Sequence, residues 1–379
     1  MITTGFIYFL AAIISLGVLY VRRIYGYWQD RGVPFIEPHF PKGSISSLGK
    51  TEHFFEMIKR FYVELKGEGK PVGGTFFMTT PVAVALDLNF IKTILVKDFH
   101  YFHDRGFYVN ERDDPLTANL LTIEGSQWRA LRTKLSPSFT NGKMKLILPI
   151  IKDISDRFVQ CLNEELCKRE EINLSGYMSR FMMDIIASSA FGLDCNTLKD
   201  SNNEFFIMSQ AASDTFIART LKKVFMTSFK KLSIFLRLKV TKDQTSQYYT
   251  RIVEETMSYR DRNNVQRDDF LSMLMQLRNK GNLDGDSGNA KDSGKLTNNE
   301  IVANAFLFII AGYHSSATTL EFCILELAHN AIIQENLRNE IRSVLEQHEN
   351  MLSYNALMDM KYLDKVVNGK PRTISEIHY

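Results

Sequence analysis

Residues 301–328 read IVANAFLFIIAGYHSSATTLEFCILELA, and this stretch decides the fold. It contains no proline and a single glycine, so it predicts one unbroken helix. Thr297 and Glu300 stand just before it in the T-x-x-E spacing of a capping box, which marks the helix start. About 30 residues at 1.5 Å per residue make a rod of roughly 45 Å. Because its first half is apolar nearly all round, we expect the rod to run through the middle of a large protein.

Small and hydroxyl-bearing residues interrupt the bulky side chains of this helix at residues 311–319, AGYHSSATT. Gly312 destabilises a helix interior by about 1 kcal/mol, so it needs a local reason. Small residues let a flat group lie against the backbone, and hydroxyls supply hydrogen-bond donors there. Alternatively, small residues at this point let a second helix cross closely. The local pattern leaves both interpretations open.

Apolar periodicity predicts that most of the remaining chain is helical, with one small β-hairpin within residues 75–86. Residues 279–296 are rich in Gly, Asp, Asn and Ser, which indicates a surface loop. The expected fold class is therefore mainly α with a small β-sheet (α+β). The other helices are expected at about 51–66, 91–96, 142–167, 174–191, 203–219, 222–238, 244–262, 268–278 and 333–347.

Residues 1–21 carry no charged side chain and predict a transmembrane anchor, because about 20 apolar helical residues span a bilayer. Arg22 and Arg23 follow at once, and the positive-inside rule then places the body of the protein in the cytosol. A cleaved secretory signal is the alternative, although the segment has neither a charged n-region nor a small-residue cleavage site. The prolines and glycines of residues 22–50 predict a stiff, non-helical hinge.

The composition argues against several classes of protein. The chain has 379 residues, 45% of them hydrophobic, which is ample for a large core. A net charge of +3 is too small to favour nucleic acid as a partner, and no nucleic-acid motif is present. The four cysteines have no zinc-ligand spacing, and their small number indicates free thiols in a reducing compartment.

Trp128 and Arg132 form a W-x-x-x-R pattern. On a helix, side chains four residues apart share a face. An indole N–H beside a guanidinium makes a donor pair that suits a carboxylate. Alternatively, Trp128 is a core aromatic residue and Arg132 a solvated surface charge.

In this order along the chain, these motifs resemble those of the cytochromes P450. The segment 311–319 is similar to their oxygen-activation segment, and Trp128 with Arg132 is similar to their W-x-x-x-R, which binds a haem propionate. The similarity extends from Met1 to about Asn368 and implies the cytochrome P450 fold, a haem cofactor and an N-terminal transmembrane helix. Further runs resemble microsomal members of the insect family-six type, at residues 94–98, 102–110, 114–116, 135–145, 267–271 and 362–367.

The resemblance also implies roles for residues of the long helix. Haem is expected to lie against the face that carries Ala311 and Gly312. His314 stands at the position of the acid that delivers protons, and Ser315 at the position of the threonine that hydrogen-bonds iron-bound oxygen. An imidazole can still relay protons near neutral pH. Alternatively, His314 is a surface residue outside any relay.

The resemblance ends near residue 368. Gly369 stands where the family has the glutamate of E-x-x-R, and Pro371 follows, so a helix is expected to fail here. No cysteine follows Cys323, so the F-x-x-G-x-R-x-C-x-G loop that supplies the iron ligand has no match, and no metal ligand is assigned. The chain is therefore expected to be truncated. Residues 51–379 would form the N-terminal part of a catalytic domain, interrupted after about residue 368.

The activity implied by the resemblance is a haem-thiolate monooxygenase. Such an enzyme inserts oxygen into apolar xenobiotics or endogenous lipophiles, with electrons from an NADPH-cytochrome reductase. The implied location is the endoplasmic reticulum membrane, with one N-terminal anchor and a cytosolic body. Because the thiolate ligand has no match, the chain as given is expected to be inactive. The alternative is a haem-free, non-catalytic truncated membrane protein.

Charged residues elsewhere suggest two contact surfaces and one surface ion pair. Lysines in the Phe-rich and Lys-rich stretch 222–239 are expected to meet anionic membrane lipid, or alternatively to form a solvated face. A second group of basic residues is expected to face the reductase. A second E-x-x-R, Glu335 with Arg338, predicts a surface pair on one helix. The lysines toward lipid are Lys222, Lys223, Lys230 and Lys231, and the residues toward the reductase are Arg129, Lys134, Lys143 and Lys145.

Overall fold

The computed structural model of the chain describes residues 2–48, 52–218, 220–267, 269–281 and 294–377. The described chain is mainly helical with a single two-stranded sheet, so the predicted fold class is confirmed. It divides into two compact units. The first unit comprises Met1–Tyr108 and Ala218–Leu238, and the second comprises Val109–Ile217 and Lys239–Tyr379.

The first unit is built around the predicted β-hairpin. Strands β1 (Val72–Phe77) and β2 (Thr80–Ala85) pair antiparallel, with Phe77 opposite Thr80. The indole N–H of Trp28 donates to the carbonyl of Thr75 at 3.0 Å, so part of the expected hinge packs against the sheet. The described part of the unit also holds five α-helices, α1 (Ile2–Tyr25), α2 (Phe54–Lys66), α3 (Leu88–Lys92), α8 (Thr220–Ser228) and α9 (Lys230–Phe235).

Helix α1 covers the predicted anchor and leaves its apolar side chains in the open. Tyr8, Phe9, Leu16 and Leu19 are each more than half exposed. Among the described residues, the helix that is long and apolar enough to cross a bilayer is Asn298–His329, which the second unit partly buries. The anchor at residues 1–21 therefore remains a prediction, supported by the exposure of α1.

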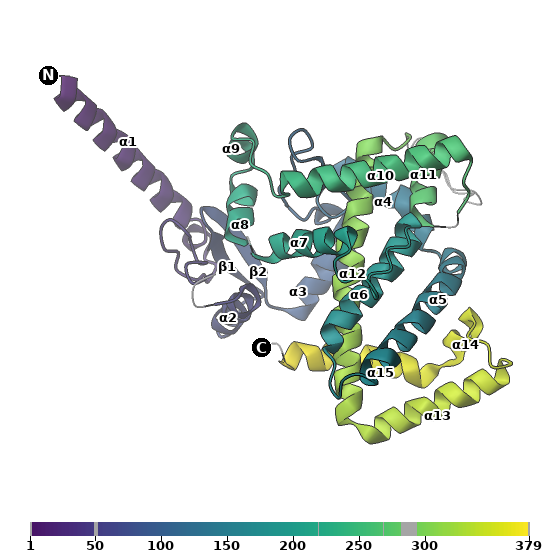
Figure 1. Cartoon of the computed structure of the whole chain (residues 1–379). Helices are drawn as coiled ribbons and strands as arrows, with labels where there is room; N and C mark the ends of the chain where they lie inside the picture. The colour runs from purple at the N-terminus through teal and green to yellow at the C-terminus, as the bar shows by residue number, and fades with distance from the viewer. Residues whose placement is uncertain (1, 49–51, 219, 268, 282–293, 378–379) are drawn as a thin grey trace. The chain divides into compact units, whose positions relative to one another are not determined.

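The second unit is a bundle around one long helix. Helix α12 (Asn298–His329) runs through it, and α6 (Leu174–Ile186) packs along α12 (Figure 1). The predicted capping box is confirmed, since the Thr297 amide donates to Glu300 at 2.7 Å and the Glu300 amide donates to the Thr297 hydroxyl at 3.2 Å. The other α-helices are α4 (Gly125–Leu135), α5 (Asn141–Leu166), α7 (Glu204–Ala218), α10 (Asp243–Asn263), α11 (Phe270–Lys280), α13 (Ala331–Gln347), α14 (Tyr354–Asp359) and α15 (Lys361–Ile377).

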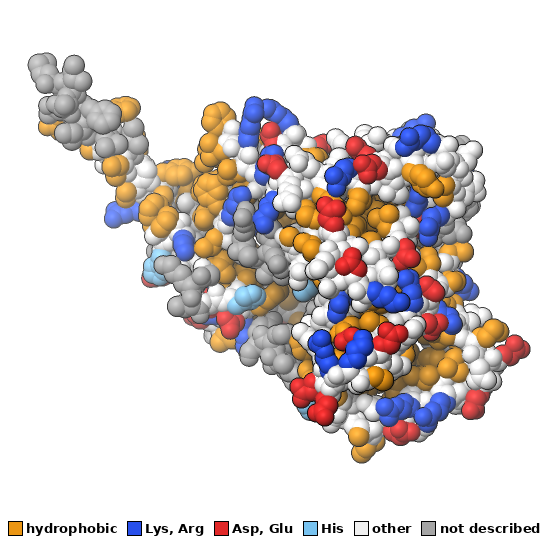
Figure 2. All heavy atoms as spheres, in the orientation of Figure 1, with side chains coloured by type: hydrophobic (Ala, Val, Ile, Leu, Met, Phe, Trp, Pro, Cys, Tyr) orange, Lys and Arg blue, Asp and Glu red, His pale blue; other side chains and the backbone are white. Residues whose placement is uncertain are grey.

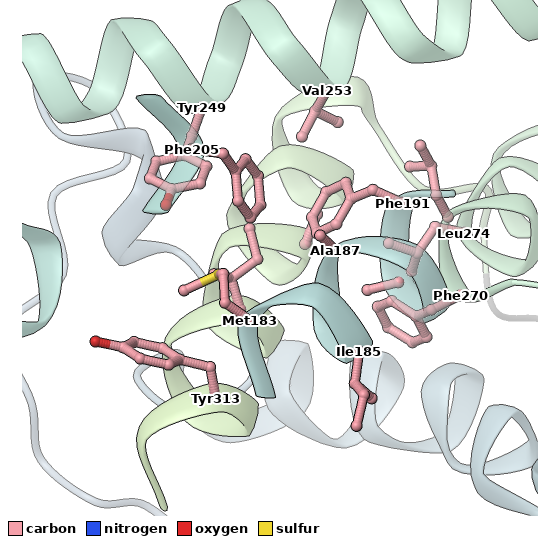
Figure 3. Packing of buried hydrophobic residues seen from close by; sticks show 14 of the residues in the cluster. Met183, Ile185, Ala187, Phe191, Phe205, Tyr249, Val253, Phe270, Leu274 and Tyr313 are labelled. Atoms are coloured by element: carbon pink, nitrogen blue, oxygen red, sulfur yellow. The ribbon is translucent and has the colours of Figure 1, made fainter. Parts of the chain in front are cut away.

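Aromatic side chains fill the centre of this bundle. Phe205 of α7 and Tyr249 of α10 lie edge to face, with ring centroids 6.1 Å apart. Figure 3 shows them above Met183 of α6 and near Phe191, while Tyr313 of α12 lies on the other side of Met183. Burial of such large apolar surfaces is the main term that stabilises a helical bundle.

An ion pair is also buried in this unit. The Arg260 guanidinium donates to both carboxylate oxygens of Asp269, at 2.7 and 2.6 Å, and both side chains are almost fully buried. Arg260 also donates to the carbonyl of Phe191 at 2.6 Å. Next to it, Gly192 has a positive φ of 67°, and a Cβ there would lie 2.7 Å from the guanidinium. The pair thus joins α10, α11 and the turn after α6.

One expectation about the C-terminal region needs correction. Helix α15 continues through Gly369 and Pro371 to Ile377, so the expected helix failure is wrong. A proline removes one helix hydrogen bond, here to the carbonyl of Val367. Val367 is exposed, so water can satisfy that carbonyl. Earlier in the chain, the stretch 222–239, for which both one helix and a helix pair were expected, forms the pair α8 and α9, which meet at Phe229.

Buried Asp114 gives a testable pH dependence. Its Oδ2 accepts the amide N–H groups of Val240 and Thr241 at 2.8 and 2.9 Å, and burial raises the pKa of this carboxyl group. The folded protein therefore binds the proton more tightly than the unfolded chain. The stabilising contribution is full below the unfolded pKa near 4 and is lost as pH rises through the folded pKa.

We expect Asp114→Asn to remove this slope, because an amide oxygen still accepts both N–H groups but does not titrate. The measurement is the free energy of unfolding in urea from pH 4 to pH 8. Wild type should lose stability with rising pH relative to the variant, by at most about 1.4 kcal/mol per pH unit. Asp156→Asn, at an exposed position on α5, is the control. Parallel curves for wild type and Asp114→Asn would contradict the assignment.

Candidate haem-facing site

The middle of α12 has an open face. Ala311, His314 and Ser315 are exposed, whereas Tyr313 and Ala317 on the opposite side are buried. The Ser315 hydroxyl donates to the carbonyl of Ala311 at 2.5 Å, and this bond fixes the direction of its proton. A small residue, a hydroxyl and an imidazole therefore lie together on one accessible surface of the longest helix.

Gly312 lies on another side of α12. A Cβ at this position would come within 2.6 Å of Cδ1 of Ile186, at the end of α6. That is far below van der Waals contact, so the glycine lets the two helices approach closely. This observation supports the helix-crossing alternative for Gly312. A role in binding haem remains a prediction for this residue.

Helix α4 turns Arg132 toward solvent, whereas the indole nitrogen of Trp128 is buried. Leu131 and Leu135 of the same helix are buried, Trp128 is half-buried and Arg132 is exposed. The backbone carbonyl of Arg132 accepts the Ser136 hydroxyl at 2.7 Å. Among the described residues, no acidic side chain forms an ion pair with the Arg132 guanidinium, which leaves this cation available for a carboxylate.

Contacts at both ends of α4 join it to α12. After α4, the Phe139 ring packs on Phe308 of α12 with centroids 5.3 Å apart. Before α4, the amide N–H of Leu120 donates to the side-chain oxygen of Asn304 at 3.0 Å. Phe308 and Asn304 precede Ala311 by one and two helical turns, so both contacts lie on the α12 surface that leads to the open face.

The second E-x-x-R is a surface pair, as predicted. Arg338 and Glu335 lie 3.5 Å apart on α13, and both side chains are about half exposed. Arg342 approaches the same carboxylate at 3.8 Å. The pair therefore stands in solvent and contributes little to stability.

Comparison with known proteins identifies the family. The Cytochrome P450 family model matches residues 37–369. The chain belongs to the cytochrome P450 family. It is 38% identical to cytochrome P450 6A1 of Musca domestica over 363 residues, which are 96% of this chain and 70% of that protein. It is also 38% identical to probable cytochrome P450 6a20 of Drosophila melanogaster and 35% identical to cytochrome P450 6a2 of that species, each over 96% of this chain and 72% of the relative.

Membership in the cytochrome P450 family implies haem and monooxygenase chemistry, and a haem site at the residues described above remains a prediction. The open face of α12 offers a small side chain and a hydroxyl, and α4 offers a guanidinium and an indole for a propionate. These are the groups that the sequence singled out, apart from Gly312.

The cysteines of the chain are poorly suited to supply a thiolate ligand for haem iron. Cys195 is half-buried, and burial raises the pKa of its thiol to about 12, so it does not supply a thiolate. Cys323 is buried on α12 itself, whereas Cys161 and Cys167 lie on or just after α5. Within the described residues, no cluster of His, Cys, Asp and Glu could hold a metal ion.

Sequence reasoning missed one residue near the site. Asn304 is fully buried, and it is the polar side chain within the apolar run Ile301–Ile310. A single polar residue in an apolar run indicates a specific hydrogen bond, because a buried amide is costly unless it is hydrogen-bonded.

Proposed function

We propose that the protein is a membrane-bound cytochrome P450 monooxygenase that acts on lipophilic small molecules with electrons from an NADPH-dependent reductase. The single observation that carries the proposal is the open face of α12, where Ala311 and Ser315 stand exposed in the middle of a core helix. Family membership supports the reaction class. Haem with a thiolate ligand supplies activation of dioxygen in this family.

The chain's own residues would bind the cofactor edge and handle protons. The Arg132 guanidinium and the Trp128 indole are the donors for a propionate. The Ser315 hydroxyl, whose proton points to the Ala311 carbonyl, presents its oxygen as an acceptor. His314, exposed next to it, can take up a proton from water and release it on the same face.

Exposed apolar surface supports attachment to the endoplasmic reticulum membrane. Besides α1, the short helix α9 exposes Leu232, Ile234 and Phe235, the last to 81%, and Figure 2 shows hydrophobic side chains gathered over α9. Lys231 is exposed beside them and suits anionic lipid. Burial lowers the pKa of Lys223 to about 8, so this lysine keeps most of its charge at pH 7 and loses it only at higher pH.

Basic residues of α4 and α5 are candidates for the reductase contact. Arg129 and Lys145 are exposed, and Lys134 and Lys143 are half-buried. Lys145 also lies 4.9 Å from the ring centroid of Tyr354. Complementary charge mainly accelerates association.

A haem-free, non-catalytic membrane protein is the second candidate, and the placement of the cysteines favours it. The reduced, carbon-monoxide difference spectrum of the expressed chain separates the two. A thiolate-type Soret band is the result expected for the monooxygenase, and a chain that binds no haem is the result expected for the second candidate. Appearance of that band would establish the catalytic reading for this chain and overturn the haem-free one.

The propionate contact is tested by comparing hemin with its dimethyl ester, which cannot pair with a guanidinium. Wild type should bind hemin about tenfold more tightly than the ester, since a hydrogen bond to a charged group is worth about 1.5–3 kcal/mol. Arg132→Ala should remove this preference, whereas Arg129→Ala on the same helix should keep it. The measurement is absorbance titration of the purified chain. Equal binding of acid and ester by wild type would refute the assigned contact.

A further inference from the structure

The loop before α4 has its own hydrogen-bond network. The Asn119 side chain accepts the Leu121 N–H at 3.0 Å and donates to the carbonyl of Leu116 at 2.8 Å. The Asn119 carbonyl accepts the N–H groups of Thr122 and Ile123 at 3.0 and 3.1 Å. Because these bonds close within the loop, residues 116–123 should move as one piece.

Asn304 fastens this loop to α12. Its side chain is fully buried, its oxygen accepts the Leu120 N–H at 3.0 Å, and its amide group donates to the carbonyl of Glu300 at 2.7 Å. Both ends of the carboxamide are therefore used. The Leu120 N–H points away from the loop's own network and toward α12, so the bond joins the loop to the helix.

The position of this bond relates it to the open face. Asn304 lies seven residues before Ala311, which is two turns or about 10 Å along the same side of α12. Leu120 lies eight residues before Trp128, and the loop enters α4 directly. A rigid loop held at Leu120 therefore sets where α4 begins, while the Phe139–Phe308 contact holds its other end.

We propose that Asn304 is a positioning residue, which fixes the loop before α4 and thereby holds Trp128 and Arg132 in register with the open face of α12. The inference rests on the proposed function, because the register matters only if both elements bind one haem. The side chain of Asn304 hydrogen-bonds Leu120 and Glu300. Its effect passes through Leu120 and the loop.

The first test is hydrogen exchange of the loop amides in the haem-free chain. Asn304→Leu removes the acceptor, so the Leu120 amide should exchange about tenfold faster or more. The Leu121 amide, bonded within the loop, should keep its protection. Asn299→Leu is the matched control, since Asn299 is exposed in the first turn of the same helix. Unchanged exchange of Leu120 in Asn304→Leu would overturn the proposal.

The second test uses the preference for hemin over its dimethyl ester. Asn304→Leu should reduce that preference toward unity, as Arg132→Ala does, while Asn299→Leu keeps the wild-type ratio. Asn304→Asp should restore much of it, because a buried, protonated aspartic acid retains one acceptor and one donor. If Asn304 only stabilised the core, replacing it by leucine would lower the melting temperature without changing the ratio of hemin affinity to ester affinity.

The outcomes separate this proposal from the one on which it rests. If wild type shows no preference for hemin, the proposed function fails and the positioning role fails with it. If wild type shows the preference and folded Asn304→Leu retains it, only the positioning role is overturned. If Asn304→Leu does not fold, Asn304→Asp above and below the pKa of its carboxyl group provides the comparison. A carboxyl oxygen accepts the Leu120 N–H in either protonation state, so this variant should keep the preference on both sides of that pKa, and loss of the preference would overturn the role.

Discussion

Asp269→Ala should lower the free energy of unfolding by about 3–5 kcal/mol, the range for breaking a buried ion pair by removing one partner. The remaining Arg260 guanidinium is 4% exposed and would lose two charge-assisted bonds of 2.7 and 2.6 Å. Asp269 also caps α11, because its Oδ1 accepts the amide N–H of Ser272 at 2.9 Å. Loss of that cap adds to the penalty by about 1 kcal/mol.

The measurement is urea denaturation followed by far-ultraviolet circular dichroism, with the midpoint and slope fitted separately. Asp261→Ala is the matched control, because Asp261 pairs with Arg278 at 2.8 Å with its side chain 45% exposed. That change should cost at most about 1 kcal/mol. Asp269→Asn keeps the shape of the side chain but not its charge. Its loss of unfolding free energy should lie between those of Asp269→Ala and Asp261→Ala.

A double variant separates the loss of the pair from the loss of volume. Replacing Arg260 by Met and Asp269 by Leu leaves no buried charge, so the double variant should be more stable than Asp269→Ala. Equal losses for Asp269→Ala and Asp261→Ala would contradict the buried pair.

The elements that the sequence predicted well are those whose signals are local. Periodicity over many turns gave α5, α10 and α12, and the Thr297–Glu300 capping box fixed where α12 begins. Helix α14 was missed because its six residues, Tyr354–Asp359, span less than two turns and leave little periodicity to detect. Helix α15 continues past Gly369 and Pro371 because helix propensity is a weak prior.

The site was predictable in residue types but not in geometry. The segment 311–319 and the W-x-x-x-R pair contain the exposed groups of α12 and α4. Yet the sequence could not assign Gly312 to a helix crossing, because its partner Ile186 lies more than a hundred residues away along the chain. The role of Asn304 was hidden for the same reason, since its acceptor oxygen serves the distant amide of Leu120.

Gly312 is the position where helix packing and cofactor binding make different predictions for the haem-free chain. A Cβ here would lie 2.6 Å from Cδ1 of Ile186 and 3.3 Å from its Cγ1. Gly312→Val should therefore destabilise the chain without any cofactor, by about 1–3 kcal/mol for overpacking. Gly312→Ala should be nearly neutral, because the terminal methyl of Ile186 can rotate away and alanine gains about 1 kcal/mol in helix propensity.

A double-mutant cycle with Ile186→Val completes the argument, because valine lacks the Cδ1 atom that the new Cβ would meet. In that background, Gly312→Ala should raise the free energy of unfolding by up to about 1 kcal/mol, and Gly312→Val should lose part of its penalty. Both are measured by urea denaturation of the haem-free chain. If Gly312→Val left the haem-free chain at wild-type stability and weakened only hemin binding, the glycine would be kept for the cofactor and not for the crossing of α6 over α12.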